Sequence, residues 1–478
     1  MSENKLAKIV SLAKRRGFIF PSSEIYGGVG GVYDWGPYGV ELKNNFKKLW
    51  WKTFVEDRDD VVGIESSVIM NRRVWQASGH EERFIDWMIE CNKCKSRFRL
   101  DDYPQIKYKA KPDVKEISWE YDDVNHPLIC QKCKNEIDIE PMAVSKLAGV
   151  SREKNKPRPF NPLFKTYIGP VQSEEDFTYL RPETAQGMFT NFKQILETAR
   201  KKIPFGIAQM GKSFRNEITP KNFIFRTREF EIAEIEYFVK PGDDEKAFGK
   251  WLKDWEKFYL DLGLSKENIV HNEHSKKDLS HYSKRTVDLN YKFPFGEKEL
   301  AGVANRTDYD LKAHEKASGK DLKYFDQEKG EKYTPYVIEP TLGVERSLFA
   351  IICDAFEEVE GGRTETTKAV KDAEIVLKID PKLAPIKVAV LPLVKKLSGK
   401  AKEVYDEIKK CYRSEYDEVG SIGRRYRRQD EIGTPYCVTI DFDTKKDETV
   451  TIRDRDTMKQ ERIKISEISQ YMWEKLNK

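Results

Sequence analysis

The segment from Arg215 to Glu234 has the residue types and spacing best suited to chemistry in this chain. Arg215 and Glu217 are two positions apart, so in a strand their side chains share one face. On the return strand, Phe230 and Glu234 share a face about 13 Å apart, which suits a nucleotide base at one end and a small substrate at the other. Arg215 and Arg226 together indicate a polyphosphate ligand, because a guanidinium can bind two oxygens at once. A salt-bridged surface hairpin is the alternative interpretation.

A second pattern, Ile338-Glu-Pro-Thr-Leu-Gly-Val-Glu-Arg346, leads into a predicted helix at Ser347–Phe356. Gly343 lacks a side chain, so a ligand can approach the backbone there. Arg346 lies near the N-terminus of the helix, a place that favours anions. This pattern therefore also predicts an anionic ligand.

Four of the seven cysteines form two pairs, Cys91-x-x-Cys94 and Cys130-x-x-Cys133. Two such pairs suit a tetrahedral Zn²⁺ site with four thiolate ligands, which would staple the segment rather than catalyse. The long gap between the pairs leaves free structural thiols as the alternative. An odd number of cysteines without a signal peptide predicts a reducing, cytoplasmic compartment.

Two other features suggest no ligand. The glycine-rich stretch of residues 26–33 lacks the Gly-Lys-Ser/Thr ending of a phosphate-binding loop, so it is interpreted as a flexible turn. His271, His274 and His281 are too loosely spaced to require a metal, and we assign them to solvent or packing.

The elements that must position these residues follow from hydrophobic periodicity, which predicts an α+β domain with an antiparallel sheet. The expected elements are helices near 6–16, 38–54 and 184–200, and strands near 61–69, 205–210, 212–218 and 225–239. A further helix carries an aromatic stripe that ends at Gly263, and this stripe predicts a buried face.

Length and composition limit the class of protein. The 478 residues suffice for about three domains, and a hydrophobic content of 39% excludes a disordered chain. No run of about 18 apolar residues occurs, so we expect no membrane span. The formal net charge is +5, and residues 383–478 contribute most of it, with 21 basic and 17 acidic residues.

The two charged patterns resemble motifs 2 and 3 of the class II aminoacyl-tRNA synthetases. The pattern Phe-Arg-x-Glu, a loop, then Arg-x-x-x-Phe-x-x-x-Glu runs from Phe214 to Glu234. In detail the chain resembles the homodimeric glycyl-tRNA synthetases over most of its length. Further matching segments are Trp35-Gly-Pro-Tyr-Gly-Val-Glu-Leu-Lys43, Ser78-Gly-His80, Phe164-Lys-Thr-Tyr-Ile-Gly169, Arg181-Pro-Glu-Thr-Ala-Gln-Gly187, Glu299-Leu-Ala-Gly-Val-Ala-Asn-Arg-Thr-Asp-Tyr-Asp-Leu311 and Gly423-Arg-Arg-Tyr-Arg-Arg-Gln-Asp-Glu-Ile-Gly-Thr-Pro-Tyr436.

The resemblance implies an organisation into domains. We expect a discontinuous class II catalytic domain with an antiparallel sheet, followed by an α/β anticodon-binding domain. The expected ranges are 1–90 and 155–375 for the catalytic domain, 91–154 for the cysteine-pair insertion, 245–290 for a helical insertion, and 383–478 for the anticodon-binding domain.

The resemblance also implies the ATP contacts. Arg215 would hold the α-phosphate, Glu217 would accept from the adenine amino group, and Phe230 would stack on the adenine ring. Arg226 and Arg346 would hold the γ-phosphate of a bent ATP molecule.

Glu299 would coordinate Mg²⁺ by the same resemblance. The remaining expected ATP contacts are Asn216, Phe225, Leu300 and Gly343. Arg215 and Arg346 are the expected catalytic residues, because displacement at phosphorus needs positioning and charge neutralisation rather than a protein nucleophile.

The amino acid implied by the resemblance is glycine, whose ammonium group carboxylates can bind. The expected glycine contacts are Arg99, Glu183, Phe230, Glu234, Glu339 and Thr341. Thr341 stands where the family usually has Ser, which keeps the hydroxyl and adds a methyl group. A pocket filled beyond Cα excludes larger amino acids, so we expect no editing domain.

A homodimer is implied as well, with one departure from the class. Motif 1 usually ends in proline, but no proline lies between Pro37 and Pro104, and Asn71 stands near the expected place. The long helix and the strand of the motif remain, so we still expect dimerisation.

The implied macromolecular partner is tRNA(Gly). The run Arg424–Arg428 is expected to meet RNA phosphate, with Tyr426 or Tyr436 available for stacking. A solvated helix face is the alternative interpretation of this run.

Two other functions stay open at this point. One is a class II synthetase for another amino acid. The other is a non-catalytic nucleic-acid-binding relative that keeps the fold, although such a protein would be expected to lose the ATP-binding residues.

Overall fold

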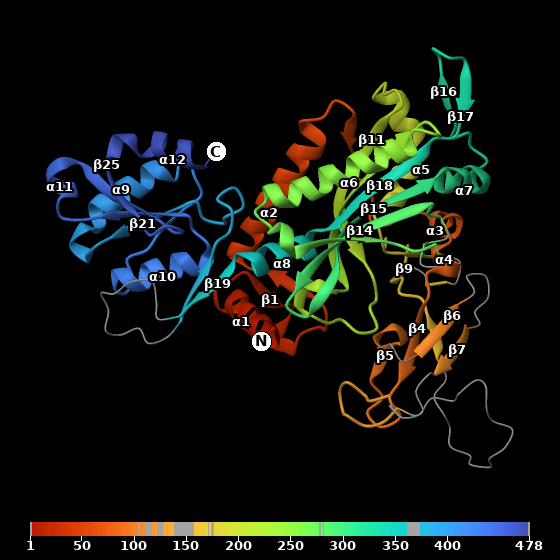
Figure 1. Cartoon of the computed structure of the whole chain (residues 1–478), viewed down its shortest axis with the longest axis horizontal. Coiled ribbons are helices and arrows are strands. Elements are labelled where there is room, and N and C mark those ends of the chain that lie inside the picture. Colours follow the sequence, from red (N-terminus) through yellow and green to blue (C-terminus); the bar gives the residue numbers. More distant parts are fainter. Residues whose placement is uncertain are drawn as a thin grey trace.

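The computed structural model describes residues 2–103, 106–110, 117–121, 128–137, 157–170, 172–173, 176–276, 279–280, 282–360 and 373–476. Figure 1 shows a central sheet with its helices, a smaller α/β domain (blue) on one side, and an arm of short strands (orange) on the other. Within the described ranges, no helix combines the length and the apolar character needed to cross a membrane.

Seven strands form the central sheet, in the order β13-β14-β15-β18-β12-β11-β3. Neighbouring strands are antiparallel except for β11 and β3, which run parallel. The strands are β3 (Val61–Gly63), β11 (Phe205–Phe214), β12 (Glu229–Val239), β13 (Ile269–Glu273), β14 (Arg285–Phe293), β15 (Gly296–Thr307) and β18 (Tyr336–Gly343). The predicted antiparallel α+β architecture is therefore confirmed.

One face of the sheet packs against three helices, α2 (Pro37–Trp51), α6 (Asp244–Asp261) and α8 (Val344–Ala355), in the largest hydrophobic core. Figure 1 shows α6 lying along the sheet. Its Trp251 and Trp255 are buried together with Trp50 of α2. The aromatic stripe that ends before Gly263 is thus a core face, as the sequence predicts.

The opposite face packs against α5 (Ala185–Thr198) and α7 (Tyr309–Ser318). Phe238 on β12 meets Phe192 of α5, with ring centroids 4.4 Å apart. Because side chains alternate along a strand, Glu234 and Glu236 point to this face as well. On this face of β12, the carboxyl groups of Glu236 and Glu234 therefore come next to Phe238, which lies in the apolar core.

Strand β11 corrects one sequence expectation, since it is a single strand where two were expected, at 205–210 and 212–218. Gly211 does not interrupt it. A Cβ atom at Gly211 would lie 2.2 Å from the nearer guanidinium nitrogen of Arg181, so glycine makes room for that side chain within the strand.

The N-terminal part and the arm contain short elements around the sheet. These are α1 (Ser2–Arg15), β1 (Ile19–Pro21), η1 (Glu24–Tyr26), β2 (Tyr33–Trp35), η2 (Lys52–Glu56), α3 (Arg72–Ala77), α4 (His80–Arg83), β4 (Asp86–Glu90), β5 (Arg97–Arg99), η3 (Leu100–Asp102), β6 (Ile106–Ala110), β7 (Ile117–Tyr121), β8 (Arg158–Phe160), β9 (Lys165–Tyr167) and β10 (Phe177–Tyr179). Short connecting elements are η4 (Phe223–Phe225), η5 (Lys266–Asn268), β16 (Tyr324–Asp326), β17 (Glu331–Tyr333), β19 (Phe356–Val359) and β20 (Glu374–Leu377).

The C-terminal domain has a five-stranded sheet in the order β22-β21-β23-β24-β25, with β22, β21 and β23 parallel. Its elements are β21 (Val388–Pro392), η6 (Lys395–Leu397), α9 (Ser398–Ile408), β22 (Ser414–Tyr416), α10 (Ile422–Ile432), β23 (Tyr436–Ile440), α11 (Thr444–Asp447), β24 (Thr449–Asp454), β25 (Gln460–Lys464), η7 (Ile465–Glu467) and α12 (Ile468–Leu476). The Tyr38 hydroxyl donates to Glu415 at 2.8 Å and so joins this domain to α2.

The arginine run on α10 is placed differently from the expectation. Arg425 is buried and donates to the carbonyl of Pro392, and Tyr436 is buried as well. The Tyr426 hydroxyl is hydrogen-bonded to Thr439. The expectation that Tyr426 or Tyr436 is available for stacking on RNA is therefore wrong, because Tyr426 packs between α10 and the sheet, and Tyr436 packs on the opposite face toward α9 and α12.

Candidate active site

A pocket of about 270 Å³ opens on the sheet face that carries Glu234. It collects residues from five separate segments of the chain. Its lining includes Glu183, Arg215, Glu217, Phe225, Arg226, Phe230, Glu234, Tyr282, Glu299, Arg306, Glu339, Thr341, Gly343 and Arg346. Most residues expected to bind ATP or glycine therefore meet in one cavity.

Arg215 lies just past the end of β11, so the premise that it shares a strand face with Glu217 is wrong. Its backbone N–H donates to the carbonyl of Arg228 at 3.0 Å, and its Nε donates to the carbonyl of Pro182 at 3.2 Å. The guanidinium lies 5.5 Å from the centre of the Phe230 ring. A fixed backbone and a ring contact thus hold the cation at the pocket wall.

Glu217 is buried, and its Oε2 accepts no hydrogen bond from any residue in the described part of the chain. Two cations lie near that oxygen, Arg99 Nη1 at 3.8 Å and Arg226 Nε at 4.0 Å. A buried acceptor facing the pocket suits the amino group of a base. Arg99 reaches this end of the site from the arm and pairs with Asp86 at 2.9 Å, but it does not line the pocket.

Arg346 lies in the first turn of α8, as its position near a helix start predicts. Its Nη1 is 3.1 Å from Glu299 Oε2, and its Nε donates to the carbonyl of Phe225 at 3.3 Å. The charge of Arg346 lowers the pKa of Glu299. Glu299 is therefore an ionised and half-exposed carboxylate, the kind of oxygen ligand that Mg²⁺ takes.

Two residues expected to contact ATP do not line the pocket. Leu300 is fully buried in the core on the other side of the sheet. Asn216 is tied by its backbone N–H to the carbonyl of Pro162 at 2.7 Å.

The opposite end of the pocket is formed by carboxylates. Glu183 receives a hydrogen bond from Gln186 at 2.9 Å and lies 3.3 Å from His80 Nε2. Glu234 accepts from the Thr184 hydroxyl. Thr341 faces Glu234 on the neighbouring strand. The carboxyl groups of Glu183, Glu234 and Glu339 thus line one end of the pocket, and Arg306, which lines it as well, donates to Glu339.

Burial and mutual repulsion set the charge of these groups. Burial, followed by the charge of Glu183, raises the pKa of Glu234. Burial also raises the pKa of Glu339 well above its usual range. For Glu183, burial acts in the same direction, but His80, Arg306 and Gln186 together outweigh it, so its pKa is lowered. A cation that enters this space would therefore be bound strongly and would draw protons out of the cluster.

Arg306 and Tyr282 are pocket residues that the sequence analysis missed. The Arg306 guanidinium is buried and donates to Asp310 at 2.8 and 2.9 Å and to Glu339 at 2.9 Å. It lies 4.1 Å from the centre of the Tyr282 ring. The signal for Arg306 was present, because an arginine four residues before Asp310, at the end of an apolar strand, needs buried partners.

Comparison with known proteins agrees with this geometry. Residues 164–355 match the tRNA synthetase class II core domain (G, H, P, S and T), and residues 387–475 match an anticodon binding domain. The glycine–tRNA ligase of Thermobifida fusca is 50% identical over 476 residues, which cover 98% of this chain and 97% of the relative. Those of Caldanaerobacter subterraneus and Clostridium acetobutylicum are 50% and 51% identical, each over at least 98% of both chains.

The chain belongs to the glycine–tRNA ligase family. The residues that line the pocket, from Glu183 to Arg346, lie within the matched class II core, and the expectation of a class II synthetase is confirmed. The other class II synthetase and the non-catalytic relative, both left open by the sequence, are less consistent with matches of this length.

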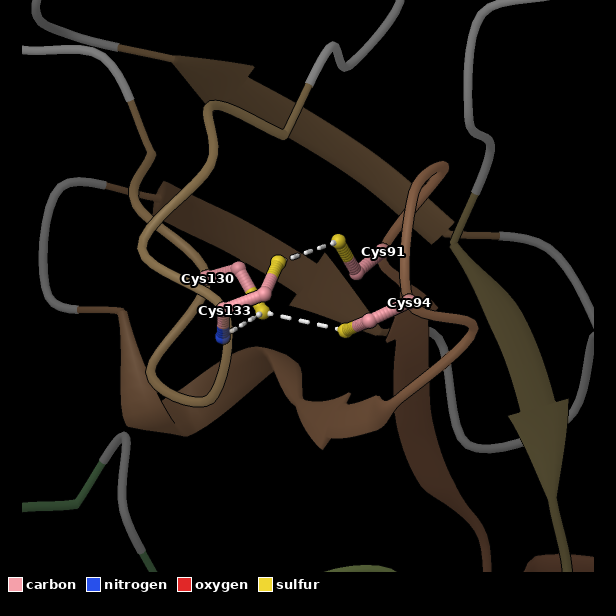
Figure 2. Close-up of side chains that lie close together, drawn as sticks. All are labelled: Cys91, Cys94, Cys130 and Cys133. Atoms are coloured by element: carbon pink, nitrogen blue, oxygen red, sulfur yellow. Dashed lines mark hydrogen bonds between the residues drawn. The ribbon is translucent and has the colours of Figure 1, made fainter.

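The two cysteine pairs of this glycine–tRNA ligase family member come together in the arm. Their four sulfurs all lie within 4.8 Å of one another, and Figure 2 shows the two pairs facing each other. Cys91 Sγ is 3.6 Å from Cys133 Sγ, and Cys94 Sγ is 3.5 Å from Cys130 Sγ. Zn–S bonds of about 2.3 Å would set tetrahedral sulfurs about 3.8 Å apart, so the donor set fits Zn²⁺.

The remaining candidates have structural partners. His274 Nε2 is 2.7 Å from Asp288 Oδ2, and His271 Nε2 is 3.3 Å from Glu256. His281 lies outside the described residues. Asn71 caps helix α3, since its side chain accepts from the backbone N–H of Arg73 at 2.9 Å.

Proposed function

We propose that this chain catalyses the ATP-dependent attachment of glycine to tRNA(Gly). The observation that carries the proposal is one pocket with buried carboxylates at one end and arginines at the other. The carboxylates suit an ammonium group at the first end, and the arginines suit a nucleoside triphosphate at the second. Membership of the glycine–tRNA ligase family supports the choice of substrates.

In the first step, a carboxylate oxygen of glycine attacks the α-phosphorus of ATP. The new O–P bond gives glycyl-adenylate, the bond from the α-phosphorus to the bridging oxygen breaks, and pyrophosphate leaves with the electron pair. Arg215 would neutralise charge on the α-phosphate, and Arg226 and Arg346 would hold the γ-phosphate. Such positioned cations lower the barrier without a protein nucleophile.

The adenosine end of ATP would lie between Phe230, which offers a ring for stacking, and Glu217, whose free oxygen accepts from the amino group. Glu299 would hold Mg²⁺, which, when bound, neutralises phosphate oxygens. We propose Phe225 and Gly343 as further contacts, because both line the pocket.

The ammonium group of glycine has three N–H donors, and Glu183, Glu234 and Glu339 offer acceptors for them. The Thr341 hydroxyl adds a polar contact. Glycine has no side chain to bind, so selection must come from the lack of space beyond Cα. The buried ion pairs that join Arg306 to Asp310 and Glu339 would keep this end of the pocket rigid.

In the second step, a hydroxyl of the terminal tRNA ribose attacks the glycyl carbonyl, an ester bond forms, and AMP leaves. The anticodon-binding domain would contact the tRNA at a distance from the pocket, and Arg424 is the exposed cation of the arginine run on α10. We place the reaction in the cytoplasm, where all seven cysteines would stay reduced.

We also propose that two copies associate. Strand β3 is the edge of the central sheet, and beside it an open hollow is lined by Lys47, Trp51, Gly63, Ile64, Glu65 and Met210. An edge strand beside an open hollow with apolar side chains is the kind of surface that a second copy can cover. Light scattering should give twice the mass of one chain, and a single-chain mass at micromolar concentration would contradict the dimer.

We propose that Cys91, Cys94, Cys130 and Cys133 bind one structural Zn²⁺, and that residues 91–154 form a unit stapled by it. Metal analysis of the purified protein should find about one zinc per chain. Cys130→Ser should lose the metal, whereas Cys411→Ser, which changes an exposed cysteine outside the cluster, should keep it. Equal zinc content in the two variants would contradict the site.

The proposed reaction is tested by ATP–pyrophosphate exchange with a panel of amino acids, followed by charging of tRNA(Gly). Exchange should depend on glycine and should be far weaker with alanine or serine. Preferred activation of another amino acid would overturn the choice of glycine, and exchange with none would overturn the enzymatic function.

A further inference from the structure

Glu236 is a buried carboxyl group that has no role in the reaction proposed above. It lies on β12 two residues after Glu234, so both side chains point to the same face of the sheet. Its exposed fraction is 0%. Neither of its carboxyl oxygens has a hydrogen-bond partner within the part of the chain that the structure describes. An ionised carboxylate at such depth without a donor would be strongly disfavoured, so the protonation state of the group needs an explanation.

The carboxyl oxygens of Glu234, Glu236 and Glu339 all lie within 4.8 Å of one another. Glu234 is opposite Thr341 and Tyr237 is opposite Ile338, so the register places Glu236 next to Glu339. Glu234 and Glu339 line the pocket, whereas Glu236 does not. Glu236 therefore lies behind the two carboxylates that face the substrate, on the side of the α5 core.

The neighbours of Glu236 already have hydrogen-bond donors. The Thr184 hydroxyl donates to Glu234, and Arg306 Nη1 donates to Glu339 at 2.9 Å. A donor favours the ionised form of a carboxyl group, and like charges at this separation cannot all be ionised. Among the three, Glu236 is the group to which no side chain in the described part of the chain donates, so it keeps its proton even when its neighbours are ionised.

The charged groups that act on Glu236 are Glu339, Arg306, Glu234 and Asp310, from four different elements. Burial, followed by the negative charge of Glu339, raises the pKa of Glu236 well above its usual range. This direction agrees with the geometry, in which a neutral carboxyl group can donate to a carboxylate but a charged one can only repel it.

We propose that Glu236 is a positioning residue for the amino acid: its neutral carboxylic acid donates a hydrogen bond to Glu339 and keeps Glu339 and Glu234 aimed at the ammonium group. The inference rests on the proposed function, because it assumes that glycine binds at this end of the pocket. Glu183, Glu234 and Glu339 would then accept hydrogen bonds from the ammonium group, and Glu236 would lie behind them and keep its proton.

The test compares Glu236→Gln with Glu236→Leu by ATP–pyrophosphate exchange, with glycine and ATP varied separately. Gln is neutral, has nearly the same shape and still donates, so its KM for glycine should stay within about threefold of the wild type. Leu cannot donate, so its KM for glycine should rise by on the order of tenfold while its KM for ATP stays within about twofold. A general loss of structure would move both constants and would lower the melting temperature as well.

Two results would overturn the inference. One is an unchanged KM for glycine in Glu236→Leu, and the other is a Glu236→Gln variant whose KM for glycine rises more than tenfold, since this would mean that a negative charge is required. The second result decides the matter even when Glu236→Leu does not fold. Glycine-dependent exchange by the wild type, measured alongside, separates these outcomes from a failure of the proposed function.

Discussion

The two ends of the pocket differ in how deeply their charged side chains are buried. At the glycine end, Glu234 and Glu339 are 3% and 6% exposed, and hydrogen bonds from Thr184 and Arg306 fix them. At the nucleotide end, the side chains of Glu299 and Arg346 are 51% and 26% exposed and pair with each other. A small substrate with one cationic group needs a dry, rigid site, whereas a large polyanion is held by several partly hydrated contacts.

The largest effect is expected at the nucleotide end. Arg215→Ala should lower the exchange rate by about 100- to 1,000-fold, because charge that develops on the α-phosphate loses its cation. The fold should persist, since the residue lies past the end of β11 at the pocket wall. Lys212→Ala, which removes an exposed cation from the same strand, is the control and should stay within about twofold. Normal exchange by Arg215→Ala would remove the residue from the site.

A smaller effect that spares ATP is expected at the glycine end. Glu234→Gln removes one charge that faces the ammonium group, so the KM for glycine should rise about 10- to 100-fold, with the KM for ATP nearly unchanged. Glu331→Gln, on the exposed β16–β17 hairpin, is the matched control. An equal rise in both KM values would show that the two ends are not independent.

The pH dependence should also separate the two ends. Burial raises the pKa of Glu234 and Glu339, so these carboxyl groups take up protons at a higher pH than exposed ones. As the pH falls below those values, the ammonium group loses charged partners, and the KM for glycine should rise by up to about tenfold per pH unit. Arginines keep their charge, and Arg346 lowers the pKa of Glu299, so the KM for ATP should change less. A glycine KM that falls with decreasing pH would contradict the assignment.

The smallest effect concerns Thr341. Thr341→Ser keeps the hydroxyl and removes one methyl group, so the KM for glycine should change by no more than about threefold. Discrimination against alanine should weaken more than glycine binding, because the methyl group fills space near the substrate. Measuring exchange with both amino acids checks this, and Thr341→Ala shows what the hydroxyl itself contributes.

Strand alternation made part of the site predictable. Phe230 and Glu234 lie on one face of β12, as a period of two requires, and Arg346 lies in the first turn of α8. Arg215 and Glu217 could not be placed in this way, because β11 ends at Phe214 and both residues belong to the turn that follows. The motif singled out these two residues, but where they lie depends on where β11 ends.

Long-range contacts explain what the sequence analysis missed. Arg306 looks like an isolated charge within an apolar strand, and its partners lie on β18 and α7. The prediction for Tyr426 and Tyr436 was wrong for the opposite reason. The sequence left both side chains available for RNA, but both have contacts inside the C-terminal domain. In each case, the role of the residue depends on the burial of its side chain, which the sequence did not reveal.

The sequence by itself determined the family, the antiparallel class II core, the cysteine pairs and most of the residues that line the pocket, because local spacing and motif order carry that information. The tertiary structure decided which carboxyl groups face the substrate, which one lies behind them, and which cations are free to meet a ligand. These features depend on the register of β12 against β18 and on the helices that close one face of the sheet. Burial is a property of the whole fold, and it is the main cause that raises the pKa of Glu234 and Glu339 at the glycine end.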